Sequence, residues 1–135
     1  MKLTSKGRYA VMAMADLATY AKDKPVSLTE ISIRQNISLA YLEQLFIRLR
    51  NEKLVKSLRG ANGGYVLIKP ASEIKLSNII FAVNEEVRTL NCKKESKRGC
   101  TNRSKKCITH NLWEKLDKHI NFFFDNVKLD ELVGK

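Results

Sequence analysis

Residues 27–68, SLTEISIRQNISLAYLEQLFIRLRNEKLVKSLRGANGGYVLI, decide the fold, because they specify two helices and a hairpin in immediate succession. Ser27 and Glu30 are spaced as a capping box, in which each residue's side chain accepts a hydrogen bond from the other's backbone N–H. The pattern predicts a short helix that begins after Ser27 and ends near Gln35.

A second helix is predicted to begin after Ser38, which is a favourable N-cap residue. Asn36 and Ile37 supply the tight turn between the two helices. This arrangement is typical of a helix-turn-helix, although a small three-helix bundle gives a similar pattern. The apolar stripe of the second helix recurs at i, i+3, i+4 and i+7 and consists of Leu42, Leu45, Phe46 and Leu49.

Outward from this stretch, residues 5–21 form an apolar helix that ends before Pro25, and residues 54–59 and 65–68 have the character of short strands. Asn62-Gly63 between the strands favours a hairpin, because both residues tolerate positive φ. A hairpin directly after a helix-turn-helix is a wing. We therefore expect a winged helix-turn-helix.

Two more helices are expected towards the C-terminus. One spans residues 74–83 and is capped near Ser77, and a long final helix starts at about residue 111. The final helix is very apolar for a small domain, which favours a homodimer interface over packing on its own chain. The residues expected at this interface are Leu112, Trp113, Leu116, Ile120, Phe123 and Val127.

The predicted fold class is therefore mostly α with a small β-hairpin wing. We divide the chain into a winged helix-turn-helix domain (residues 1–84), a ligand-binding loop (85–110), and a dimerisation helix with a C-terminal tail (111–135).

The chain has a net charge of +11, and the excess lies in residues 1–85 and 86–110. A basic domain beside a nearly neutral helix indicates a module that binds double-stranded DNA, although a basic surface also serves solubility. The N-terminus lacks the apolar region of a signal peptide, and no stretch approaches the ~20 apolar residues of a membrane span. We therefore expect a cytoplasmic protein with no membrane partner.

Cys92, Cys100, Cys107 and His110 are spaced C-x7-C-x6-C-x2-H. Thiolates with one imidazole select zinc or an iron–sulfur cluster, and the long gaps favour the bulkier cluster over zinc. Redox-active thiols without a metal are a further alternative, as are a small electron-transfer protein and a zinc-stabilised module. An enzyme is not expected, because no Cys/His nucleophilic pair, phosphate loop or spaced carboxylate pair is present.

Four segments, 1–11, 37–46, 59–65 and 106–113, closely resemble the IscR family of iron–sulfur cluster assembly regulators, winged helix-turn-helix proteins related to NsrR and CymR. The resemblance implies a homodimer with one [2Fe–2S] cluster per subunit on Cys92, Cys100, Cys107 and His110. It also implies repression of cluster-assembly genes and delivery of the cluster by the assembly machinery. A nitric-oxide or thiol sensor of the same fold is the alternative.

The resemblance also bears on DNA contacts. Gln44 and Arg59 match family contact positions, Glu43 is implicated in discriminating between two classes of site, and Ala40 stands where the family has serine. We expect Gln44 to read a base edge, Arg59 to enter a minor groove, and basic residues including Lys56 to hold phosphates. The complete expected DNA-binding set is Lys6, Arg8, Ser38, Ala40, Tyr41, Glu43, Gln44, Arg48, Arg59 and Gly60.

Overall fold

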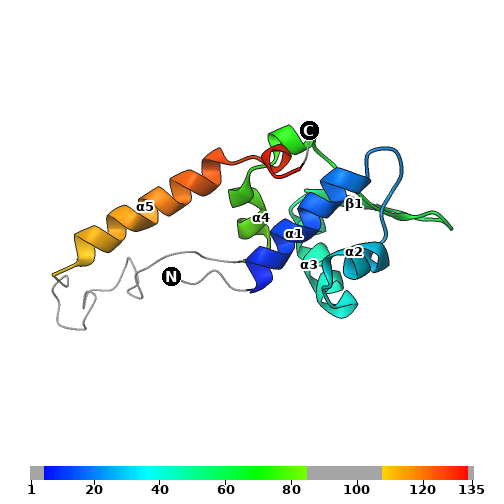
Figure 1. Cartoon of the computed structure of the whole chain (residues 1–135), viewed down its shortest axis with the longest axis horizontal. Coiled ribbons are helices and arrows are strands. Elements are labelled where there is room, and N and C mark those ends of the chain that lie inside the picture. Colours follow the sequence, from blue (N-terminus) through cyan, green and yellow to red (C-terminus); the bar gives the residue numbers. More distant parts are fainter. Residues whose placement is uncertain (1–4, 85–107, 134–135) are drawn as a thin grey trace.

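The computed structural model describes residues 5–84 and 108–133 (Figure 1). It is mostly helical with one two-stranded hairpin, as the sequence predicts. The elements are α1 (Ser5–Tyr20), α2 (Leu28–Gln35), α3 (Leu39–Asn51), β1 (Val55–Leu58), β2 (Gly64–Leu67), the 3-10 turn η1 (Ala71–Glu73), α4 (Leu76–Ala82), α5 (His110–Asn126) and the 3-10 turn η2 (Leu129–Glu131).

The helix-turn-helix is confirmed by its caps. Ser27 Oγ accepts a hydrogen bond from the Glu30 backbone N–H at 3.2 Å, and the Ser27 N–H donates to Glu30 Oε2 at 3.1 Å. Asn36 ends α2 in the left-handed conformation (φ 54°), which asparagine tolerates better than most residues. Ser38 then caps α3 by accepting from the Tyr41 N–H at 3.4 Å.

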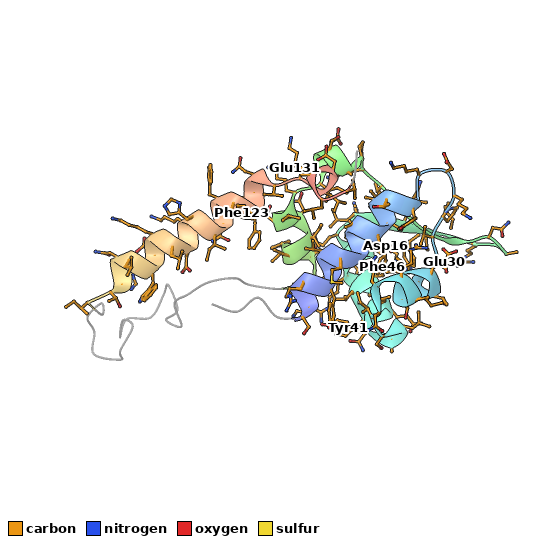
Figure 2. The ribbon with its side chains drawn as sticks, in the orientation of Figure 1. Asp16, Glu30, Tyr41, Phe46, Phe123 and Glu131 are labelled. Atoms are coloured by element: carbon orange, nitrogen blue, oxygen red, sulfur yellow. The ribbon has the colours of Figure 1, made fainter. Side chains whose placement is uncertain are left out.

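The hydrophobic core lies where α1, α2, α3, the hairpin and α4 meet. Phe46, on the buried face of α3, packs against the Tyr65 ring of β2 with centroids 4.8 Å apart (Figure 2). All four residues of the predicted α3 stripe are buried, so the 3.6-residue period correctly identified the face of α3 that packs inward. Other fully buried side chains are Met14, Leu17, Ile31, Ile74, Ile79, Val55 and Leu129.

The hairpin is antiparallel, and its register pairs Val55 with Leu67 and Leu58 with Gly64. A third segment joins it, because Val26 forms a bridge with Tyr65: each backbone N–H donates to the other's carbonyl, at 3.0 and 2.7 Å. A Cβ added at Gly64 would lie 2.5 Å from the Val26 carbonyl carbon, so only glycine fits there. The bridge fixes the base of the wing to the connection between α1 and α2.

The start of α4 differs from the prediction. The helix begins at Leu76 instead of Ile74, and Ser77 lies inside it and is not its cap. The capping contact is made by the Lys75 N–H, which donates to Asn78 Oδ1 at 2.9 Å. Ile74 stays extended because its carbonyl accepts from the Leu129 N–H at 2.8 Å. This contact comes from residues more than 50 positions away, so local sequence could not reveal it.

α5 projects away from the rest of the molecule, and only its C-terminal end reaches the winged domain (Figure 1). Val127, which was expected at the homodimer interface, ends this helix and packs against the core of its own chain. Leu129 follows and is fully buried. Across residues 5–84 and 108–133, no helix is long and apolar enough to cross a membrane.

Candidate nucleic-acid interface

The outward face of α3, with its N-cap Ser38, carries four of the predicted DNA-binding residues. Ser38, Ala40, Glu43 and Gln44 are all exposed, whereas the opposite face of the helix is buried in the core. A rigid helix with one anchored face and one free polar face is the form that a recognition helix takes.

Tyr41 is half-buried and is held by a second tyrosine. Its ring meets that of Tyr9 edge-on, with centroids 5.8 Å apart and planes at 88°. This contact places the start of α1, with Lys6 and Arg8, beside the N-terminal half of α3 (Figure 2). Arg8 is exposed and Lys6 is partly so, and phosphate contacts by these two residues stay predictions.

Arg48 makes a contact within the fold that sequence reasoning missed. Its Nη1 donates to the Val83 carbonyl at 3.2 Å, at the C-terminal end of α4. The side chain is half-buried and holds α3 against α4. A phosphate contact by Arg48 stays a prediction, and the structure gives the residue a positioning role as well.

The wing supplies a second basic element. Arg59 and Lys56 are exposed, on the turn and on β1, and the hairpin extends beyond the helical core (Figure 1). Gly60 has φ +125° with open space around it, so the need for glycine there is conformational. A residue with a side chain would strain the turn that presents Arg59.

Sequence reasoning also missed three residues that join α1 to α2. Asp16 is buried in α1 and accepts hydrogen bonds from Arg34 and Gln35 of α2. The available signal was an aspartate among the apolar positions of α1.

Ile47, half-exposed on α3, was also overlooked, because it lies off the apolar stripe of that helix.

Three of the four expected cluster ligands, Cys92, Cys100 and Cys107, lie outside the described residues. His110 is the first residue of α5, and its half-buried ring places Nε2 3.4 Å from Glu114 Oε2. Within the described ranges, no group of three or more potential metal-binding side chains comes together. The structure therefore places one imidazole, that of His110, at the start of α5, and the segment that contains the cysteines precedes it in the sequence.

The expected dimerisation residues form an open apolar face. Leu112, Trp113, Leu116 and Phe123 are exposed, Ile120 is partly so, and no residue of α5 is buried. The Trp113 indole Nε1 donates to Thr109 Oγ1 at 2.9 Å, which fixes the ring at the start of the helix. Phe122, which the sequence also places on the apolar face of the final helix, is exposed as well, and Phe81 on α4 is an exposed phenylalanine that was not predicted.

Comparison with known proteins finds one matching family and several similar regulators. A family model described as "Rrf2: Iron-dependent Transcriptional regulator" matches residues 3–135. The HTH-type transcriptional regulator IscR of Photorhabdus laumondii is 51% identical over 134 residues, covering 99% of this chain and 80% of that protein. The solved structure of T. potens IscR is 39% identical with a TM-score of 0.77, covering 98% of this chain and 85% of that one. CymR, the global cysteine regulator of B. subtilis, is 32% identical with a TM-score of 0.81, covering 98% and 95%.

Proposed function

Because this chain belongs to the Rrf2 family of iron-dependent transcriptional regulators, we propose that it regulates cluster-assembly genes according to whether it carries an iron–sulfur cluster. It is a transcriptional regulator and not an enzyme, as its relatives are. The observation that carries the proposal is the combination of a winged helix-turn-helix domain with three cysteines, at 92, 100 and 107, followed by His110 at the start of α5.

In the proposed DNA complex, α3 lies in the major groove and Gln44 hydrogen-bonds a base edge, with adenine as its best partner. Arg59, on the wing, enters the neighbouring minor groove, and Arg8 and Lys56 hold phosphates. Glu43 lies beside Gln44 and penalises sites that bring a phosphate or base acceptor against its carboxylate. Each of these side chains is exposed, so each is accessible to a duplex.

The active unit is proposed to be a homodimer joined through α5. Leu112, Leu116 and Phe123 recur on one side of this helix and are exposed in the single chain. Apolar area removed from water is worth about 25 cal/mol per Å², so covering this face with a second copy is favourable. The two winged helix-turn-helix domains of the dimer then bind a pseudo-palindromic duplex whose half-sites are about one helical turn apart.

The proposed ligands are Cys92, Cys100, Cys107 and His110, and one [2Fe–2S] cluster per subunit is the preferred occupant, with zinc as the alternative. When bound, a cluster would supply an oxidisable iron centre held by these four residues. The donor chemistry fits, because soft thiolates with one imidazole suit iron–sulfur or zinc and not magnesium. The eight basic residues of 86–110 would offset the negative charge of a thiolate-bound cluster. Delivery would come from the cytoplasmic assembly machinery.

The test is anaerobic purification of the full chain, followed by a visible spectrum, iron and sulfide analysis, and gel shifts with cluster-loaded and cluster-free protein. We expect stoichiometric iron and sulfide, charge-transfer bands, and a different preferred duplex for the two forms. Colourless protein that contains zinc would refute the cluster. Equal binding by both forms would refute sensing.

The chain offers a matched control for the ligand assignment, since it contains only two histidines. His110→Ala is expected to lose or strongly destabilise the chromophore. His119→Ala, an exposed position nine residues further along α5, is expected to keep it. Equal spectra for the two variants would remove His110 from the ligand set.

A further inference from the structure

The outermost stripe of α3 is a short series of uncharged side chains. Ala40, Gln44 and Ile47 are spaced four and three residues apart, so they lie in one row along the helix. All three are exposed, and Ile47 keeps 50% of its surface in contact with solvent. The row lies opposite Leu45 and Leu49, which are buried in the core.

The charged residues of α3 lie to the side of this row. Glu43 and Arg50, seven residues apart, share one flank of the row. Arg48 is half-buried and donates to the Val83 carbonyl. The centre of the recognition face thus presents a methyl group, an amide and a branched alkyl group in that order.

We propose that Ile47 and Ala40 are specificity-determining residues that contact thymine C5-methyl groups on either side of the base pair read by Gln44. The inference rests on the proposed function, in which α3 occupies the major groove. Thymine is the only standard base that presents a methyl group there, and alkyl side chains are its complement. An alkyl group gains nothing from a phosphate or from a polar base edge.

The spacing fits such a reading. Residues 40 and 47 are about 10 Å apart along a helix that rises 1.5 Å per residue. Successive base pairs are about 3.4 Å apart, so the two alkyl groups would be about three base-pair steps apart, with Gln44 between them. The preferred half-site is therefore an A·T-containing segment with two methyl contacts.

The experiment starts by selecting the preferred duplex from a random pool with the full-length, cluster-loaded protein. Each thymine of that duplex is then replaced in turn by deoxyuridine, which removes the methyl group and leaves base pairing intact. We expect about a fourfold loss of affinity at each contacted thymine, the ratio that corresponds to one buried methyl group.

Variants assign the contacts to side chains. Ile47→Ser should lower affinity for the thymine duplex and abolish the thymine–uracil difference at one position, and Ile47→Val should retain most of it. Ala40→Gly should abolish the difference at the other position. Ile33→Ser is the control, because Ile33 is 77% exposed on α2, outside the row, and should leave every difference unchanged. Melting temperatures verify that the variants are folded.

The outcomes separate this proposal from the one on which it rests. Failure to select any preferred duplex would overturn both. A preferred duplex with no deoxyuridine effect, or with effects that persist in Ile47→Ser and Ala40→Gly, would overturn only the methyl contacts. In that case the proposed regulatory function is retained, and Ile47 is an exposed isoleucine with no role in base recognition.

Discussion

The guanidinium of Arg34, on α2, donates two hydrogen bonds to the buried carboxylate of Asp16, on α1, from Nε at 2.9 Å and from Nη2 at 2.7 Å. Gln35 Nε2 adds a third at 2.9 Å, and the Arg34 guanidinium lies 4.0 Å from the centre of the Tyr20 ring. The hydrogen bond that Arg34 donates to Asp16 raises the pKa of Arg34 further above its ordinary, already high value. The network sets how α1 meets the helix-turn-helix.

Breaking this pair should destabilise the fold. Arg34→Ala leaves the fully buried carboxylate of Asp16 without its cation. Loss of one partner of a fully buried pair costs about 3–5 kcal/mol, and we expect about 2 kcal/mol because Arg34 retains some solvent contact. Urea unfolding measures the change. Arg59→Ala on the exposed wing is the control and should stay within about 0.5 kcal/mol of the parent, whereas equal effects would deny the pair its role.

Gly64→Ala should loosen the base of the wing. The new methyl group would overlap the Val26 backbone, and overpacking of this kind costs about 1–3 kcal/mol. The amide protons of Val26 and Tyr65, which close the bridge, should then exchange faster with solvent. Ala61→Ser at the exposed wing tip is the control and should leave exchange unchanged. Unaltered protection in Gly64→Ala would mean that the bridge is not held by this close approach.

Gln44 and Lys56 should affect DNA binding in different ways. Gln44→Ala is expected to cost about 1–3 kcal/mol at the preferred duplex and little elsewhere, because a base contact is lost. Lys56→Ala should weaken binding to all duplexes similarly and reduce the salt dependence by about one ion, because a phosphate contact is lost. Titrations of specific and unrelated DNA at several salt concentrations distinguish the two. A uniform loss for Gln44→Ala would make it a non-specific contact.

A charge placed on the open face of α5 should dissociate the proposed dimer. Phe123→Glu puts a carboxylate where 59% of the phenylalanine is exposed in the single chain, so the monomer fold should persist. Sedimentation should then report half the parent mass, and affinity for a two-half-site duplex should fall. Asn121→Glu, an exposed position on the other side of the same helix, should remain dimeric. A dimeric Phe123→Glu would place the interface elsewhere.

Much of this molecule follows from local sequence. The capping box at Ser27, the N-cap at Ser38 and the α3 stripe specified the helix-turn-helix, because caps and helical periodicity are decided within one or two turns. The hairpin was predicted in the right place, but its turn differs from the prediction. Positive φ occurs at Gly60 and Gly64 and not at Asn62 or Gly63, and β2 begins at Gly64, one residue before the predicted start. The donor set before α5 was identified from spacing alone and stays a prediction, since its cysteines lie outside the described residues.

Contacts between distant segments decided the rest. Three contacts join positions that no local pattern relates: Asp16 with Arg34, Val26 with Tyr65, and Ile74 with Leu129. Each contact fixes the position of a helix or strand relative to the others, which local propensity does not determine. Buried backbone groups and buried charges need hydrogen-bond partners, and these partners can come from segments far away in the sequence. Only the folded structure shows which segments supply them. The sequence by itself thus determined which elements form and which chemical groups they carry. The tertiary structure decided where α4 begins and α5 ends, which arginines bond within the fold, and which side chains of α3 remain exposed.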